Sequence, residues 1–218
     1  VVALNDVLDE GLPLHPLEEQ RKSVADWRQI GLGIFGLADM LIQLGCKYGS
    51  RDAKILCHKI ARTMATAALR SSAKLAAEFG AYPKFNKGAV MSSEFFNEHF
   101  DDETWKLTDA FGLRNSQLLT IAPTGSLSTM LGVSGGIEPI FDTHYTRKTE
   151  SLHGEDVYYT VYTPIVEKYM KEHGIEDVKD LPDFFVTAKT LEGLNRVEMQ
   201  AAWQDHIDAS ISSTVNLP

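Results

Sequence analysis

The most constraining segment of this 218-residue chain is residues 118–129, where an apolar stretch is followed by a proline and a glycine. The apolar stretch is typical of a buried strand, and Pro123 ends it because proline has no backbone N–H to donate. Gly125 permits a tight turn and a close approach of the backbone to a ligand. The hydroxyl residues that follow are Ser126, Ser128 and Thr129. The segment therefore predicts a strand, a turn and the start of a helix.

Such a corner is chemically suited to an anion. The first N–H groups of a helix have no partner within the helix, and the helix dipole adds partial positive charge at the same end. A phosphate bound there would accept hydrogen bonds from these groups. The alternative is an ordinary helix cap, in which Thr124 or Ser126 accepts a backbone hydrogen bond and nothing binds. The spacing does not separate the two interpretations, since it matches neither a Walker motif nor a dinucleotide fingerprint.

A second glycine pattern, at Gly31, Gly33 and Gly36, has the spacing of a dinucleotide-binding fingerprint. A true fingerprint follows a hydrophobic strand, whereas this pattern follows residues 15–29, which are helical in character. We interpret the glycines as sites of close packing in a helix that continues to Leu44. The pattern therefore does not predict a nucleotide site.

Helical periodicity predicts that the longest helix begins after Ser50 and ends at Gly80. Its expected core-facing stripe consists of Leu56, Ile60, Met64, Ala67, Ser71, Leu75 and Phe79. Further helices are predicted at 92–99, 101–111, 164–174 and 197–213, and a strand at 144–149. An aromatic cluster, interpreted as packing at the entry of a helix, is expected from Tyr158, Tyr159, Tyr162 and Tyr169.

Composition limits the possible partners. The chain is 44% hydrophobic and 23% charged, which suffices for a sizeable core. A net charge of -9 without a stripe of Lys and Arg argues against a nucleic-acid partner. A few backbone donors can still hold the phosphates of a nucleotide within an acidic protein. No apolar run is long enough to span a bilayer and no amino-terminal signal is present, so the sequence predicts a cytoplasmic protein without a membrane partner.

The cysteines and histidines give no sign of a metal site or of catalysis. Cys46 and Cys57 do not make a disulfide framework, and we interpret both as small apolar residues in packing. The histidines in predicted helices are His58, His99, His173 and His206. We expect each of them to lie at the surface or to be hydrogen-bonded in the core. No catalytic residue and no metal ligand is therefore assigned to this chain.

Several motifs, taken in order, resemble the large catalytic subunit of ribonucleotide reductase. They are residues 28–39, 114–116, 121–128, 136–139 and 211–218. The resemblance covers about residues 2–218. It implies an α/β fold, namely a helix-rich fragment of the ten-stranded α/β barrel of that family, with residues 1–218 forming part of a single catalytic domain. The abrupt apolar end of the chain also suggests excision from something larger.

The resemblance further implies reduction of a ribonucleoside diphosphate or triphosphate at its 2′ carbon by thiyl-radical chemistry, a step of deoxyribonucleotide synthesis for DNA replication. By the match to the family's motif, the resemblance implies that the substrate phosphates are bound by Pro123, Thr124, Gly125, Ser126, Leu127, Ser128 and Thr129. Asn115 and Glu138 are supporting candidates. The radical-bearing and reducing cysteines of the family match nothing in this chain, so the chain alone is expected to be inactive.

The form of residues 125–129 and 134–139 favours the adenosylcobalamin-dependent branch of the family. The alternative is the branch that takes its radical from a separate metal-containing small subunit. Expected partners are the nucleotide substrate, a thioredoxin-like or other dithiol reductant, and a second copy of the chain in a homodimer. An alternative from another class is a non-catalytic nucleotide-binding or scaffold module, which the full-length reading frame would distinguish.

Overall fold

The computed structural model describes residues 1–149 and 156–215. These residues form two compact units, each assembled from segments that are distant in the sequence. The first unit consists of Val1–Gly33, Leu56–Ile121 and Ala201–Ile211. The second consists of Ile34–Ile55, Ala122–Gln200 and the segment from residue 212 onward. A single barrel domain over residues 1–218 stays a prediction.

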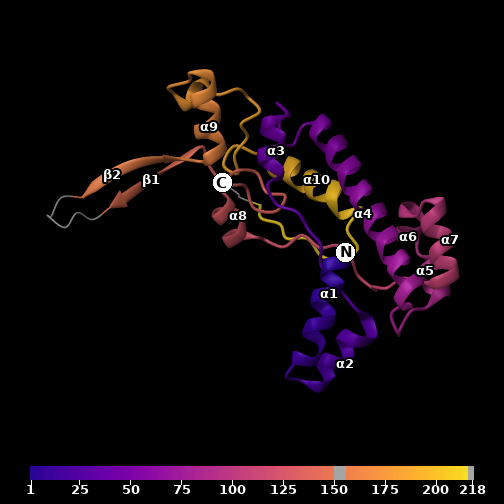
Figure 1. The fold of residues 1–218 in the computed structure, drawn as a ribbon. Helices are drawn as coiled ribbons and strands as arrows, with labels where there is room; N and C mark the ends of the chain where they lie inside the picture. The colour runs from indigo at the N-terminus through magenta and orange to yellow at the C-terminus, as the bar shows by residue number, and fades with distance from the viewer. Residues whose placement is uncertain (150–155, 216–218) are drawn as a thin grey trace. The chain divides into compact units, whose positions relative to one another are not determined.

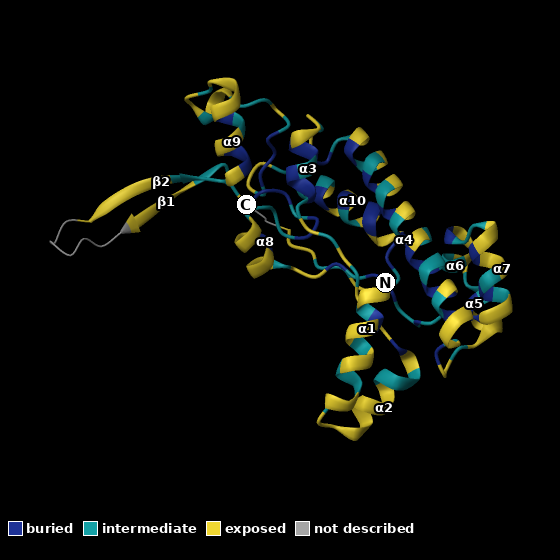
Figure 2. Cartoon of the chain, in the orientation of Figure 1, coloured by how far each residue is buried: buried dark blue, intermediate teal, exposed yellow. Residues whose placement is uncertain are grey.

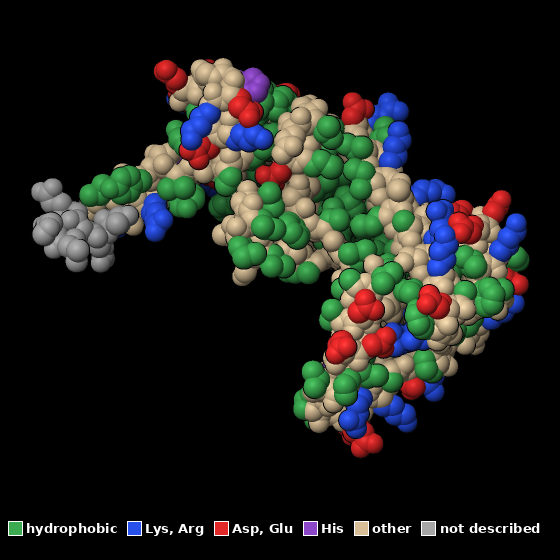
Figure 3. All heavy atoms as spheres, viewed as in Figure 1, with side chains coloured by type: hydrophobic (Ala, Val, Ile, Leu, Met, Phe, Trp, Pro, Cys, Tyr) green, Lys and Arg blue, Asp and Glu red, His purple; other side chains and the backbone are tan. Residues whose placement is uncertain are grey.

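The first unit is helical. Its elements are α1 (Val2–Gly11), the 3-10 helix η1 (Leu12–Leu14), α2 (Glu18–Trp27), most of α4 (Arg51–Phe79), α5 (Lys87–Ser92), α6 (Glu94–His99) and α7 (Asp102–Phe111). Figure 1 shows α5, α6 and α7 gathered beside α4. Arg70 of α4 pairs with Asp101, and Lys74 pairs with Glu103 at 2.8 Å. These ion pairs link α4 to the start of α7. Figure 3 shows acidic and basic side chains interspersed in this region.

The long helix α4 begins and ends as predicted. The Ser50 hydroxyl accepts a hydrogen bond from the Ala53 N–H at 3.1 Å, and Gly80 follows the helix with a φ of 83°. The predicted core stripe is wrong, because its members are only partly buried and Ala67 and Phe79 are exposed. The buried face consists of Ala53, Cys57, Ala61, Ala65, Ala68, Leu69, Ser72, Ala73 and Ala76. Small side chains allow neighbouring backbone to approach closely, which puts the alanine face inside.

The helix predicted to continue to Leu44 is wrong at its start. Residues 31–35 are non-helical, Gly36 has a φ of 81° in the left-handed region, and α3 covers only Leu37–Gln43. The extended chain makes an isolated parallel bridge to the segment 118–121. A Cβ atom at Gly33 would lie 2.2 Å from the carbonyl oxygen of Thr120. Close backbone approach between two extended segments, and not helix packing, therefore accounts for this glycine.

The predicted corner at residues 118–129 is confirmed as an extended, buried segment followed by α8 (Gly125–Leu131). Isolated parallel bridges are formed by Leu32 with Leu119, Ile121 with Ile211, and Ile140 with Thr187. Each bridge lies within one unit. Parallel pairing of this kind is typical of α/β proteins.

The second unit combines helices with a β-hairpin. Its further elements are β1 (His144–Thr149), β2 (Val157–Tyr162), α9 (Pro164–His173), the 3-10 helix η2 (Val178–Asp180) and most of α10 (Gly193–Gln204). The strands are antiparallel, with His144 opposite Tyr162. Figures 1 and 2 show them as a two-stranded ribbon that is largely exposed. The predicted strand at 144–149 is confirmed, and so is the predicted helix at 164–174, which Pro164 opens at its first position.

Helix α10 begins before the predicted range of 197–213 and ends well before its close. The side-chain amide of Gln204 donates hydrogen bonds to the carbonyl oxygens of Ile207 at 3.1 Å and Ala209 at 2.9 Å. These bonds satisfy carbonyl groups in a turn and thereby compete with a further helical turn. The chain is consequently non-helical from residue 205 to residue 215.

The predicted tyrosine cluster is wrong. Tyr158 and Tyr159 lie on β2 and are 63% and 53% exposed. Successive side chains of a strand point to opposite faces, so these two rings do not contact each other. Tyr162 packs against a histidine of the paired strand, with ring centroids 5.9 Å apart. Tyr169 lies on α9 and stacks on His173, with ring centroids 3.9 Å apart. The tyrosines therefore pack in separate places.

Histidines that are distant in the sequence meet in the first unit. The rings of His58 and His99 each lie within hydrogen-bond distance of His206, at 3.1 Å and 2.7 Å. His99 and His206 are buried, as expected for hydrogen-bonded core histidines, and His58 is exposed. Their assembly had no signal in the local sequence.

Candidate phosphate-binding site

The candidate site starts at Thr124, which has a φ of 52° in the left-handed region. A threonine rarely adopts this conformation, so other contacts must hold it. Its hydroxyl accepts a hydrogen bond from the N–H of Gly136 at 2.9 Å. The turn is thereby tied to the glycine-rich segment that follows α8, and Thr124 does not cap its own helix.

The hydroxyl groups of the first helical turn are used inside the helix. Ser128 and Thr129 donate hydrogen bonds to the carbonyl oxygen of Gly125, at 3.2 Å and 2.8 Å. The N–H of Ser128 donates to the carbonyl oxygen of Thr124 at 2.8 Å. The hydroxyl groups of Ser128 and Thr129 are therefore not free to donate to a ligand, whereas the sequence led us to expect that they would be. The first helical N–H groups, which have no acceptor among the described residues, are those of Gly125, Ser126 and Leu127.

A hollow of about 980 Å³ lies beside this loop in the second unit. Gly125, Ser128 and Thr129 line it, together with Gly135 and Glu138. The predicted phosphate residues that do not line it are Pro123, Thr124, Ser126 and Leu127. The helix α8 therefore begins at the rim of a space large enough for a small-molecule ligand.

Glu138, a supporting candidate from the sequence, is held by an ion pair. Its carboxylate accepts hydrogen bonds from Arg196 of α10 at 2.8 Å and 3.2 Å, and from the N–H of Thr214 at 3.1 Å. Arg196 is only 3% exposed. No local pattern in the sequence pointed to Arg196, because 58 residues separate it from Glu138.

Ser134 connects the glycine-rich segment to α3. Its N–H donates to the carboxylate of Asp39 at 2.7 Å, and its carbonyl oxygen accepts from the N–H of Gly36 at 2.8 Å. Its hydroxyl accepts from the N–H of Ala38 at 3.2 Å. The third glycine of the fingerprint-like pattern thus lies at a helix start that Ser134 caps from a distant part of the chain.

A charged pair stands at the wall of the hollow. Lys189 donates a hydrogen bond to Asp142 at 2.5 Å and lies 5.5 Å from the centre of the Phe141 ring. The hydrogen bond from Lys189 lowers the pKa of the Asp142 carboxyl, and the N–H of Thr143 adds to the effect. Acidic and basic groups therefore accompany each other around the hollow.

Asn115, the other supporting candidate, lies in the first unit and is buried. Its side-chain amide exchanges two hydrogen bonds with the amide of Asn5, at 3.1 Å and 3.0 Å. It also accepts from the Ser72 hydroxyl at 3.1 Å and donates to the carbonyl oxygen of Arg28 at 2.8 Å. These bonds give Asn115 a structural part in its unit, and a role at the phosphate site stays a prediction.

The described residues contain no group of His, Cys, Asp and Glu that could hold a metal ion. Nor does any helix in that part of the chain have the length and apolarity needed to cross a membrane. Cys57 is fully buried and Cys46 is partly buried. Their burial agrees with the packing role predicted for them.

Comparisons with known proteins bear on these motifs. A family model described as "Ribonucleotide reductase, barrel domain" matches residues 1–218. A "Vitamin B12-dependent ribonucleoside-diphosphate reductase" of Mycobacterium tuberculosis is 31% identical, over 99% of this chain and 30% of that protein. A protein of the same description from Thermoplasma acidophilum is 32% identical, over 98% of this chain and 27% of the relative. A "Ribonucleoside-diphosphate reductase large subunit" of Danio rerio is 32% identical, over 81% of this chain and 23% of that subunit.

The chain spans less than a third of the length of these relatives. The family model nevertheless covers the chain from end to end. The helix-rich structure with its small two-stranded sheet and parallel bridges is consistent with an α/β fragment. The chain therefore belongs to the ribonucleotide reductase family, as part of its barrel domain.

Proposed function

We propose that residues 123–129 bind the phosphates of a ribonucleoside diphosphate in the large subunit of a ribonucleotide reductase. One observation carries the proposal: α8 begins at the rim of the hollow, directly after the left-handed turn at Thr124. The N–H groups of Gly125, Ser126 and Leu127 have no acceptor among the described residues. Phosphate oxygens accept hydrogen bonds from such groups, and the helix dipole favours their charge. A triphosphate would use the same donors.

The residues around these donors support binding of an anion. A Cβ atom at Gly125 would meet no other atom within 4 Å, so a ligand can come close to the backbone there. Thr124 holds the turn through its bond to Gly136. The negative charge of Glu138 is compensated by Arg196, which limits its repulsion of a phosphate. In this proposal, the chain binds and orients the substrate.

The test is Ser126→Asp in the full-length protein, with Ser126→Asn as a neutral control of similar size. An acidic residue at a helix start does not lower stability, but it repels a phosphate. We expect Ser126→Asp to weaken substrate binding by at least about tenfold, the effect of losing one charge-assisted hydrogen bond. Binding affinity and Tm are measured together. A variant that melts normally and binds as well as Ser126→Asn would refute the proposal.

A second variant, Gly125→Val, tests close approach of the ligand to the backbone. A Cβ atom at this position meets no atom of the surrounding segments within 4 Å, so the branch point of the new side chain has space. The added methyl groups would obstruct a phosphate at the N–H groups of the first turn. We expect weaker binding with a nearly unchanged Tm. Unchanged binding would place the phosphates elsewhere.

We further infer that the full-length protein reduces the 2′ carbon of its substrate by thiyl-radical chemistry within a ten-stranded α/β barrel. Family membership and the isolated parallel bridges support this inference, since single bridges are what fragments of a larger parallel sheet would make. The reaction needs a dithiol reductant, such as a thioredoxin-like protein. A homodimer and a cytoplasmic location stay predictions.

We also infer that the full-length protein belongs to the adenosylcobalamin-dependent branch. The form of residues 125–129 and 134–139 supports this inference. Relatives named vitamin B12-dependent match nearly the whole chain, and so does a "Ribonucleoside-diphosphate reductase large subunit" of Arabidopsis thaliana, so coverage does not distinguish the branches. When bound, the cofactor would supply the radical that starts the reaction. No residue of this chain is assigned to the cofactor. Turnover with adenosylcobalamin and no second protein is expected. A requirement for a metal-loaded small subunit would favour the other branch.

A further inference from the structure

We propose that Arg196 is a positioning residue for the substrate site, acting through Glu138. The proposal rests on the proposed function, because it concerns the loop assigned there to the phosphates. Arg196 is absent from the motifs that identify the family in this sequence. Its part in the site follows from burial and hydrogen bonds alone.

The contact between Arg196 and Glu138 has the geometry of a strong ion pair. Two guanidinium nitrogens, Nη2 and Nε, donate to the two carboxylate oxygens at 2.8 Å and 3.2 Å. A planar guanidinium matches a carboxylate in this paired arrangement, whereas a lysine ammonium does not. The Arg196 side chain is 3% exposed and that of Glu138 is 24% exposed. The pair therefore holds Glu138 in a defined orientation.

Glu138 in turn is connected to the loop. Its N–H donates to the carbonyl oxygen of Gly135 at 2.9 Å, which closes a tight turn. Within that turn, the N–H of Gly136 binds the hydroxyl of Thr124. A Cβ atom at Gly135 would lie 3.0 Å from the carbonyl oxygen of Pro123, so the two backbones already touch. A shift of Glu138 would therefore displace the start of α8.

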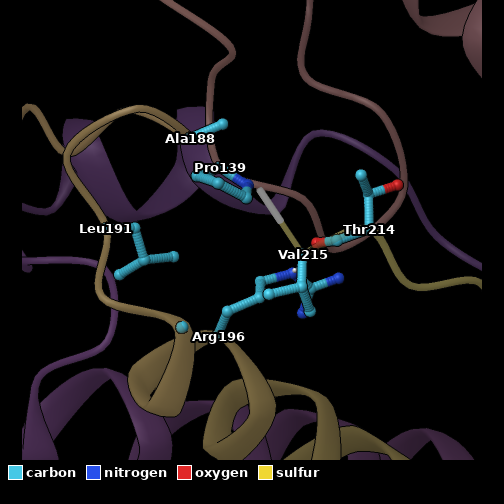
Figure 4. Close-up of a pocket in the computed structure, with 7 residues that line it drawn as sticks. Pro139, Ala188, Leu191, Arg196, Thr214 and Val215 are labelled. Carbon is cyan, nitrogen blue, oxygen red and sulfur yellow. Dashed lines mark hydrogen bonds between the residues drawn. The ribbon is translucent and has the colours of Figure 1, made fainter. Parts of the chain in front are cut away.

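A third segment completes the arrangement. Arg196 Nε also donates to the carbonyl oxygen of Thr214 at 3.2 Å, and the Thr214 N–H donates to Glu138. Figure 4 shows Arg196 extending from the start of α10 toward Thr214 and Val215. These residues border a cavity of about 10 Å³, which has room for about one water molecule. The Nη1 atom of Arg196 is buried and has no partner among the described residues.

The experiment compares Arg196→Lys with the wild type in the full-length protein. The lysine keeps the positive charge but loses the paired hydrogen bonds. We expect KM for the ribonucleoside diphosphate to rise about tenfold, which corresponds to the loss of one charge-assisted hydrogen bond between the displaced α8 and the phosphates. The value of kcat should change less than about twofold. Direct binding of the ribonucleoside without phosphates should be unchanged. A merely structural role would weaken binding of both ligands equally.

Lys54→Met is the matched control, because it removes another ion pair of α10, between Lys54 and the more exposed Glu198. It should leave KM unchanged. If Arg196→Lys does not fold, Glu138→Gln provides the second variant, since its amide keeps an acceptor for Arg196 and loses the charge. An unchanged KM in whichever variant folds, or equal losses for the diphosphate and the ribonucleoside, would overturn the proposal.

The outcome for Ser126→Asp separates the two proposals. If Ser126→Asp weakens diphosphate binding and Arg196→Lys does not, the phosphate site stands and the positioning role fails. If Ser126→Asp has no effect, the phosphate site fails, whatever Arg196→Lys does. If both variants weaken binding of the diphosphate selectively, both proposals are supported.

Discussion

The Nδ1 atom of His206 lies 2.7 Å from the Nε2 atom of His99, although 107 residues separate them in the sequence. The Nδ1 atom of His99 is 2.7 Å from the carbonyl oxygen of Phe95, which can only accept. Neutral His99 therefore carries its proton on Nδ1 and accepts at Nε2 from the Nδ1–H of His206. His58 then donates from Nδ1 to the Nε2 atom of His206. These hydrogen bonds all form when the three rings are neutral.

We predict that the folded protein loses stability as the pH falls through the ordinary histidine pKa of about 6.5. Burial lowers the pKa of His206, and neighbouring His99 and His58 lower it further. The unfolded chain then binds more protons than the folded chain in this range. The charges of Asp205 and Glu98 raise the pKa of His206, but the net shift of this pKa is downward. The measurement is Tm at about pH 7.5 and about pH 5.5.

His206→Gln is the matched control for this prediction, because glutamine can both donate to His99 and accept from His58. The difference in Tm between the two pH values should be smaller in this variant. The raised pKa of Asp208 contributes with the opposite sign, since stability from that group falls as pH rises, but it is present in both proteins. An equal pH dependence in both proteins would contradict the assignment to His206.

A second prediction concerns Asp208, whose carboxylate accepts the N–H groups of Leu118 at 2.8 Å and Leu119 at 2.6 Å. Asp208→Ala leaves two donors beside buried side chains without a partner. We expect a loss of about 1–3 kcal/mol for each donor that water cannot reach. Asp208→Asn keeps one acceptor oxygen and should cost less. Urea unfolding measures both, and Asp6→Ala, at an exposed position of α1, should be neutral.

The third prediction uses the glycines. Gly33→Ala would force a Cβ atom to within 2.2 Å of the Thr120 carbonyl oxygen, so the paired backbones must separate. We expect a loss of at least about 2 kcal/mol, measured by chemical denaturation. At Gly11, a Cβ atom meets nothing within 4 Å, and Gly11→Ala should gain up to about 1 kcal/mol in a helix. Similar effects of the two substitutions would contradict the packing argument.

The fourth prediction is that the isolated 218-residue chain does not make deoxynucleotides. The proposed thiyl-radical reaction needs an initiating thiol and a reducing pair of thiols, whereas the chain has Cys46 and Cys57, of which Cys57 is fully buried. The assay supplies a radical source, dithiothreitol and ribonucleoside diphosphate, with the full-length protein as positive control. Product formed by the isolated chain would contradict the prediction that the initiating and reducing thiols lie outside these residues.

The sequence predicted those helix boundaries and turns that depend on residues adjacent in the chain. Ser50 and Gly80 delimit α4 because capping and helix termination involve neighbouring residues. The corner that leads into α8 follows from Pro123 and Gly125 in the same way. The core face of α4 was mispredicted, since the hydrophobicity of single residues does not reveal where other segments approach most closely.

The remaining features arise from contacts between distant residues. Arg196 and Glu138 are 58 residues apart, and Ser134 and Asp39 are 95 residues apart. One chain read without relatives contains no signal that pairs such positions. The extended conformation at Gly33 likewise depends on the segment it contacts. The conformation of the loop before α8 was therefore predictable, whereas the residues that support it were not.

The left-handed conformation of Thr124 has a consequence for protein engineering. A left-handed threonine costs about 1–2 kcal/mol relative to glycine, so a design method that scores backbone preference alone would place glycine there. Thr124→Gly would relieve that cost and at the same time remove the hydroxyl that accepts from Gly136. A thermostabilised version of this protein built by such a substitution would thus exchange a defined loop for a looser one. This position belongs among those kept constant in a stabilisation library.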